Sequence, residues 1–140
     1  MRKSINLNIE NKEGFFRRLL IWANTFSHVA YFDSNNYYQY NFSPTSYHSY
    51  EKLVAVDSIK TLNATSKNNF NNLKKFLHHN KDWVFGHFSY DLKNEIENLT
   101  SQNIDHIKFP LISFFIPKYL FIHNEKGLFF LYHPEVTNEQ

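Results

Sequence analysis

Three acidic residues in one short segment have the spacing that acid–base chemistry needs. Asp91 and Glu95 are four residues apart, and Glu97 follows closely. Side chains four residues apart share a helix face, so Asp91 and Glu95 could form a carboxylate pair that transfers protons or binds Mg²⁺. A capping aspartate followed by a solvated helix face with Lys93 and Asn94 explains the same residues. The sequence leaves both interpretations open.

Eight histidines raise the question of a metal site. Only His78 and His79 are neighbours, and adjacent helical residues point about 100° apart, so these two do not converge on one ion. Their place near the end of a predicted helix is explained by the helix dipole. We therefore predict no metal site in this chain.

Gly86 is the most informative glycine, because a glycine inside a strand marks a bulge or a close approach of another backbone. The chain has only three glycines. It contains no phosphate-cradling glycine loop and no serine in a nucleophile elbow. We therefore expect an aromatic-rich domain that has no catalytic residues of its own.

The first half of the chain shows both alternating and helical spacing of apolar residues. Asn11 is placed to cap the first helix. The expected elements in chain order are a strand at 5–9, a helix at 13–26, a strand at 28–34, a loop at 35–49 and a strand over Lys52–Leu62.

The second half is expected to begin with a helix that Ser66 caps and that ends near Asn80. Asp91 is expected to cap a short helix whose Leu92, Ile96 and Leu99 share one face. The other expected elements are a strand at 83–90, a loop at 100–110, strand pieces at 111–123 broken at Pro117, a hairpin loop at 124–127, a strand at 128–132 and a polar tail.

Strands that come in runs and end in a hairpin favour an α+β fold with largely antiparallel sheets. We expect two main helices and one short helix in a single domain of residues 1–134, with a flexible tail at 135–140. The 15 Phe and 9 Tyr residues predict an aromatic core.

Composition argues against several classes of protein. The net charge is +2, and the lysines are scattered among similar numbers of acidic residues, so nucleic-acid binding is not expected. The absence of cysteine excludes disulfides and thiolate metal sites. Neither a signal peptide nor a membrane-spanning segment is predicted, and we expect a cytoplasmic protein.

Two segments, Trp83–Leu99 and Phe109–Ile122, carry a family resemblance. The first is a strand with a glycine, a Tyr-Asp step and an acidic helix, and the second is a Phe-Pro step that opens a Pro-broken aromatic strand. In this order they resemble the amino-terminal domain of chorismate-using enzymes, namely aminodeoxychorismate synthase component I (para-aminobenzoate synthase) and anthranilate synthase component I. The Tyr90–Glu95 sequence is more similar to that of the aminodeoxychorismate synthases.

The resemblance implies a role in folate biosynthesis. There, chorismate and ammonia from a glutamine amidotransferase subunit, component II, give 4-amino-4-deoxychorismate, an amino-group transfer. In this family the chemistry belongs to a second, chorismate-binding domain, which holds the magnesium ligands and the catalytic lysine. That domain is not in this chain, so no catalytic residue is carried over, and magnesium is expected only there.

The resemblance also implies an amino-acid pocket, which holds tryptophan in anthranilate synthase and in some aminodeoxychorismate synthases. Carried across, Ser34 would hydrogen-bond the polar end of the ligand, Asp33 would meet its ammonium group, and Tyr50 would lie against its ring. Ser49 stands where the family usually has an arginine. An ordinary turn at the end of a strand also explains Asp33 and Ser34.

Two hypotheses of different classes follow. In the first, the chain is the amino-terminal domain of an aminodeoxychorismate synthase, either a truncated gene product or an excised piece, with anthranilate synthase as the alternative enzyme. In the second, it is a free-standing ligand-binding or interaction module. The first predicts a contiguous apolar patch where the catalytic domain would pack, and the second predicts a charged surface there.

Overall fold

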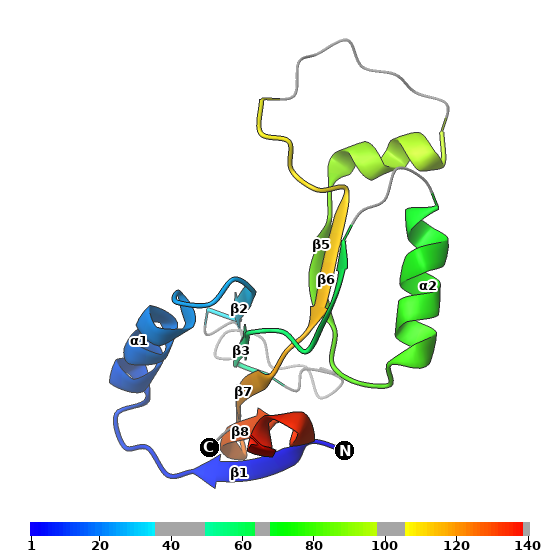
Figure 1. Cartoon of the computed structure of the whole chain (residues 1–140). Helices are drawn as coiled ribbons and strands as arrows, with labels where there is room; N and C mark the ends of the chain where they lie inside the picture. The colour runs from blue at the N-terminus through cyan, green and yellow to red at the C-terminus, as the bar shows by residue number, and fades with distance from the viewer. Residues whose placement is uncertain (36–49, 64–67, 98–105, 139–140) are drawn as a thin grey trace, which may run out of the picture. The chain divides into compact units, whose positions relative to one another are not determined.

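Two main helices and eight strands make up the described part of the chain (Figure 1). The computed structural model describes residues 1–35, 50–63, 68–97 and 106–138. The elements are β1 (Lys3–Leu7), α1 (Lys12–Ala23), β2 (Val29–Asp33), β3 (Lys52–Val56), β4 (Lys60–Asn63), α2 (Asn69–His79), β5 (Phe85–Phe88), the 3₁₀ helix η2 (Tyr90–Glu95), β6 (Ile112–Ile116), β7 (Tyr119–Asn124), β8 (Gly127–Tyr132) and the 3₁₀ helix η3 (Pro134–Asn138). All strand pairs are antiparallel, in two sheets, which confirms the predicted single-domain α+β class. Contacts within the chain group it into two compact units, Met1–Ser58 with Pro117–Gln140, and Ile59–Ile116.

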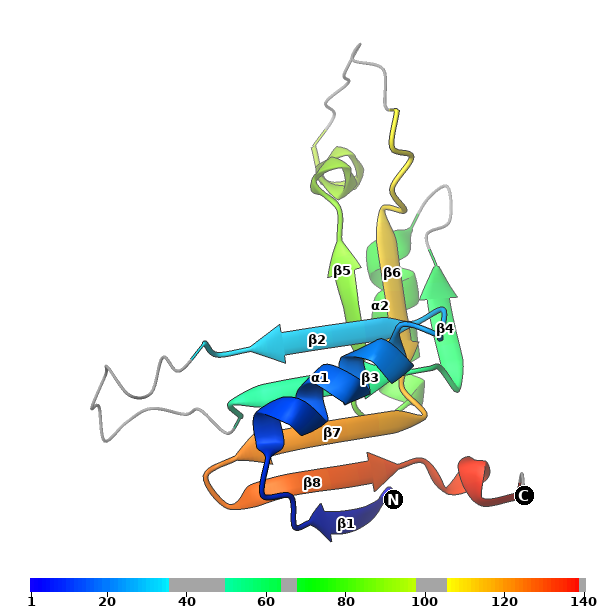
Figure 2. The ribbon, with the colours of Figure 1, turned by 90° about the vertical axis from the view of Figure 1, so that its left-hand side faces the viewer.

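The unit formed by the two ends of the chain contains a five-stranded sheet in the order β1-β8-β7-β3-β2. Figure 2 shows α1 lying across one face of this sheet. Residues paired across antiparallel strands share a face, so Tyr31, Val54, Phe121 and Phe130 form one cross-strand row. The buried core between the helix and the sheet consists of Phe16, Leu19, Ala23, Val54, Val56, Phe121 and Leu128.

The capping prediction for α1 is confirmed. The Asn11 side chain accepts a hydrogen bond from the Gly14 N–H at 2.8 Å, which satisfies one of the amides that a helix start leaves without an intrahelical partner. Phe16, Leu19 and Ala23 repeat every three to four residues and are all buried. The helix therefore forms because its local cap and its apolar stripe agree.

The predicted strand over Lys52–Leu62 is wrong in one respect, because the structure divides it into β3 and β4. Asp57 adopts the left-handed conformation, with a φ of 58°, and its side chain accepts the Ser58 N–H at 2.8 Å. Aspartate tolerates that conformation because its short polar side chain bonds locally. The turn sends β3 and β4 into different sheets.

The predicted break at Pro117 and the predicted hairpin after it are both confirmed. Pro117 separates β6 from β7, which lie in different sheets. The turn between β7 and β8 uses Gly127 at a φ of 135°, and the Asn124 side chain accepts the Lys126 N–H at 2.9 Å. A side chain other than hydrogen would be strained at that φ.

The second unit contains α2 and a three-stranded sheet in the order β4-β6-β5. Gly86 pairs with Phe114, and a Cβ at Gly86 would overlap the Ser113 carbonyl oxygen and the Phe114 ring. The close approach predicted for this glycine is therefore confirmed. The Phe70 ring of α2 stacks on Phe88 of β5, with 6.3 Å between the ring centroids.

The first turn of α2 is capped from a distant part of the chain. The Glu95 carboxylate accepts hydrogen bonds from the Asn69 backbone N–H at 2.9 Å and from the Asn69 side-chain amide. A carboxylate is favourable there because of the helix dipole. Asn68 precedes the helix in the left-handed conformation, and the predicted cap Ser66 lies outside the described residues.

A short helix, η2, forms where one was predicted, but two details of the prediction are wrong. Ser89, rather than Asp91, holds its N-cap position, and Asp91 lies within its first turn. Leu92 is buried but Ile96 is 73% exposed, so they do not form the predicted apolar face. A 3₁₀ helix has about three residues per turn, so residues four apart do not align. Leu99 lies outside the described residues.

The parts of the predicted loops that lie outside the described residues are 36–49 and 100–105, and the last two residues of the predicted tail also lie outside them. The described part of the second loop, 106–110, contains neither helix nor strand. η3 occupies most of that tail.

In the described part of the chain, no helix combines the length and the apolar character that crossing a membrane requires.

Candidate functional site

Three of the four predicted ligand residues lie at the same end of β2 and β3. Asp33 is the last residue of β2, Ser34 follows it, and the Ser34 N–H donates to the Glu51 carbonyl at 2.8 Å. Tyr50 is half-buried and directly precedes Glu51. The fourth residue, Ser49, lies outside the described residues.

The Asp33 carboxylate accepts hydrogen bonds from three donors. Lys52 Nζ lies 2.5 Å and Tyr31 Oη 2.6 Å from Asp33 Oδ2, while the Asn35 N–H donates to Oδ1 at 2.8 Å. The hydrogen bonds from Lys52 and then Tyr31 are the main causes that lower the pKa of Asp33 from 3.8 to about 2. Burial and the hydrogen bond to Asp33 raise the pKa of Tyr31. Asp33 is therefore ionised and already bound to an ammonium group.

The Ser34 hydroxyl is buried and has no hydrogen-bond partner among the described residues. Such a group has lost its bonds to water and gained none in return, which costs about 1–3 kcal/mol. A polar group of a ligand placed beside it would remove that cost. Ser89, in the other unit, has a hydroxyl in the same state.

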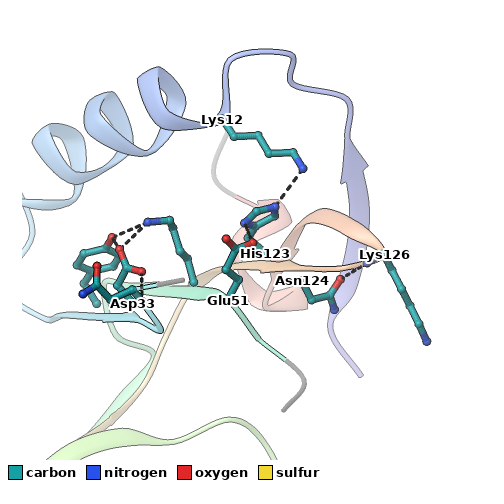
Figure 3. Close-up of polar contacts among 9 residues, drawn as sticks. Lys12, Asp33, Glu51, His123, Asn124 and Lys126 are labelled. Carbon is teal, nitrogen blue, oxygen red and sulfur yellow. Dashed lines mark hydrogen bonds and ion pairs between the residues drawn. The ribbon is translucent and has the colours of Figure 1, made fainter. Parts of the chain in front are cut away.

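A second polar cluster lies beside the first, on the side of the sheet that α1 covers (Figure 3). Asp33, Lys52 and His123 pair across β2, β3 and β7, so they form one cross-strand row. The His123 ring lies between Lys12 Nζ, 3.1 Å from Nε2, and Glu51 Oε2, 2.9 Å from Nδ1. His123 is only 8% exposed.

The two clusters together present both signs of charge. Lys12 and Lys52 are positive, Asp33 and Glu51 are negative, and burial is the main cause that lowers the pKa of His123 and keeps the ring neutral near pH 7. This arrangement suits a small ligand that carries both an ammonium and a carboxylate group, since each finds an opposite charge nearby.

Lys12, Glu51, Lys52 and His123 were not predicted as site residues. One signal in the sequence could have indicated His123. It follows Tyr119 and Phe121 at alternate positions, so on a strand it falls on the face that the core occupies. A polar residue on a core-facing position needs partners, and that requirement points to a polar cluster.

The motif residues Gly86, Tyr90 and Asp91 belong to the other unit. Tyr90 is 82% exposed, and the Lys93 ammonium lies 4.8 Å from the centre of its ring. Asp91 forms a long ion pair with Lys93 at 3.9 Å, whereas Glu95 binds Asn69. The structure therefore does not form the carboxylate pair that the spacing of Asp91 and Glu95 had suggested.

Within the described ranges, no three histidine, aspartate or glutamate side chains are grouped as a metal ion would require. The His79 ring contacts the Lys75 carbonyl at 2.7 Å, one turn back in α2.

No protein-family model matches the chain, and no curated protein matches it either.

Proposed function

We propose that this chain is the amino-terminal, non-catalytic domain of an aminodeoxychorismate synthase component I. Its role is structural and regulatory: it packs against a chorismate-binding catalytic domain and forms one side of an amino-acid pocket. In the complete cytoplasmic enzyme, the catalytic domain supplies the magnesium site, and component II supplies ammonia. The proposal rests on the sequence resemblance and on the residues that gather at the ends of β2 and β3.

The observation that carries the pocket is the Ser34 hydroxyl. It is buried without a hydrogen-bond partner among the described residues, at the position where the resemblance implies that a ligand's polar group binds. Ser34 differs from Ser89 in its surroundings, since the charged side chains of Asp33, Lys52 and Glu51 lie at the same strand ends. A zwitterionic amino acid fits those charges.

Asp33 can bind the ammonium group of a ligand only if its present contact with Lys52 changes. Its Oδ2 atom already lies 2.5 Å from Lys52 Nζ, which occupies the position of a ligand's ammonium group. Binding therefore requires Asp33 to share or exchange that partner. The chain alone also lacks the part of the pocket that belongs to the catalytic domain. For both reasons we predict weak binding by the chain alone, with a Kd of about 1 mM, or a binding free energy of about −4 kcal/mol.

The test is an NMR titration of the ¹⁵N-labelled chain with L-tryptophan. We expect saturable shift changes centred on the backbone amides of Ser34, Tyr50 and Glu51. Ser34→Ala should abolish them without lowering the free energy of unfolding. It should raise that free energy by up to about 1–3 kcal/mol, because the hydroxyl it removes is buried and has no bond to lose.

The matched control is Ser89→Ala, which removes a similarly unbonded hydroxyl in the other unit. It should bind tryptophan as the wild type does. Equal binding by wild type and Ser34→Ala would contradict the proposed pocket. So would the absence of a saturable change in the wild type up to tens of millimolar tryptophan, which corresponds to a binding free energy of about −2 kcal/mol.

The surface favours a domain that packs against a partner over an adapted free-standing module. In the Ile59–Ile116 unit, several large apolar or aromatic side chains are more than half exposed: Phe88, Tyr90, Ile96, Ile107 and Phe109. The edge strand β2 also exposes Phe32, at 51%. A protein adapted to act alone would cover such surface with charged residues.

A further inference from the structure

We propose that Lys12, His123 and Glu51 form a proton-sensitive clamp that holds the first turn of α1 on the ends of β3 and β7 while His123 is neutral. This inference does not depend on the proposed function. It rests on which groups face the two nitrogen atoms of one buried ring.

The two contacts of the ring fix its protonation state. A lysine ammonium group can only donate hydrogen bonds, so His123 Nε2, 3.1 Å from Lys12 Nζ, must accept and carries no proton. The single ring proton is then on Nδ1, 2.9 Å from Glu51 Oε2. Nδ1 makes no regular hydrogen bond within the described residues, so its contact with Glu51 is mainly electrostatic. The structure thus assigns the neutral Nδ1–H tautomer to His123.

In the described part of the chain, the elements around the ring contribute few other charges. Lys12 faces it from α1, and Glu51 and Lys52 face it from the start of β3. The neighbouring strand β8 contributes Leu128, and Phe16 of α1 lies 6.0 Å from the ring centre. Burial lowers the pKa of His123 most, Glu51 raises it, and Lys12 and Lys52 lower it further.

Protonation would break the clamp at one specific contact. A proton on Nε2 removes the lone pair that Lys12 binds and places two positive charges side by side. Lys12 is the first residue of α1, and the backbone amides of Gly14 and Phe15 are bonded to Asn11 just before it. Release of Lys12 therefore loosens the start of the helix, while Glu51 keeps its contact with the ring.

The experiment is a pH titration of the ¹⁵N-labelled chain between pH 8 and 4.5, following the His123 ring nitrogens and the Gly14 and Phe15 amides. At pH 8 we expect the ring signature of the Nδ1–H tautomer. On acidification, both amides should shift with the midpoint of His123. Lys12→Met should raise that midpoint and uncouple the amides from it, whereas Glu51→Gln should lower it.

Lys126→Met is the matched control, because the Lys126 side chain points away from the cluster in Figure 3. It should titrate as the wild type does. An Nε2–H tautomer at pH 8 would overturn the clamp. So would an unchanged midpoint in Lys12→Met, or amides in that variant that still follow His123.

Discussion

At the level of single residues, the ends of β2 and β3 are held by short ionic contacts. Asp33 and Lys52 face each other across the strands, with side chains 30% and 26% exposed, respectively. This partial exposure lets water screen the pair, so it contributes about 1 kcal/mol rather than the larger value of a buried pair. The contact positions the residues of the candidate pocket.

Asp33→Asn should lower the free energy of unfolding by about 1 kcal/mol at pH 7. The pKa of Asp33 falls from 3.8 to about 2 on folding, so the folded state favours the ionised form. The stabilisation is therefore complete above about pH 5 and is lost as the pH falls from 3.8 towards 2. Urea titrations of wild type and variant at pH 7 and pH 3 measure the difference, which should shrink at the lower pH.

Asp91→Asn provides the control for this measurement. Asp91 is also paired with a lysine, but at 3.9 Å and with its side chain 58% exposed. Its substitution should change the unfolding free energy by less than about 0.5 kcal/mol at either pH. A loss equal to that of Asp33→Asn would mean that the contact between Asp33 and Lys52 has no special role.

At the level of elements, the second sheet depends on the close approach of β5 and β6 at Gly86. A methyl group there would overlap the Ser113 carbonyl oxygen as well as the Phe114 ring. A ring can rotate away, but a backbone carbonyl moves only with its strand. Gly86→Ala should therefore destabilise the protein by about 2–3 kcal/mol, measured by chemical or thermal unfolding.

Gly14→Ala is the contrasting substitution. Its new methyl group would meet the Asn11 side chain, with Nδ2 at 2.8 Å, and that side chain can move, although this weakens the cap that it provides to the Gly14 N–H. Alanine also favours a helix by up to about 1 kcal/mol, so the net change should remain below about 1 kcal/mol. Equal effects of the two substitutions would contradict the close packing at Gly86.

Elements specified by neighbouring residues were predictable from the sequence. The Asn11 cap, the break at Pro117 and the hairpin at Gly127 each depend on residues within a few positions of one another. The division of Lys52–Leu62 was not predicted, because apolar residues flank the short turn-forming pair Asp57-Ser58 on both sides. The type of η2 was also missed, since Glu95 is held by Asn69, 26 residues earlier.

The candidate site was also predictable only in part, because some of its contacts join residues far apart in the sequence. Asp33, Ser34 and Tyr50 were identified because a family resemblance indicated them, whereas His123 was passed over as one of eight histidines. Its partner Lys12 is 111 residues away in the sequence. Only the fold, which places the start of α1 over the end of β7, brings the two together. The spacing of residues along the chain does not predict such a contact.

At the level of the whole molecule, we propose that this chain supports chorismate chemistry without performing it. Apolar side chains on the Ile59–Ile116 unit and on β2 are exposed, and in our proposal such surface packs against a catalytic domain. The charged cluster at the ends of β2 and β3 is suited to binding a ligand. In the described ranges, Asp91 and Glu95, whose spacing had suggested a carboxylate pair, are instead bound to separate partners.

The most direct test is the rate at which chorismate, ammonia and Mg²⁺ give 4-amino-4-deoxychorismate. It is measured for this chain, for a chorismate-binding domain that lacks its own amino-terminal domain, and for their mixture. We predict no product from the chain alone and a faster rate in the mixture than with the catalytic domain alone. Product from the chain alone, or a mixture no faster than the catalytic domain and no complex between the two, would contradict the claim.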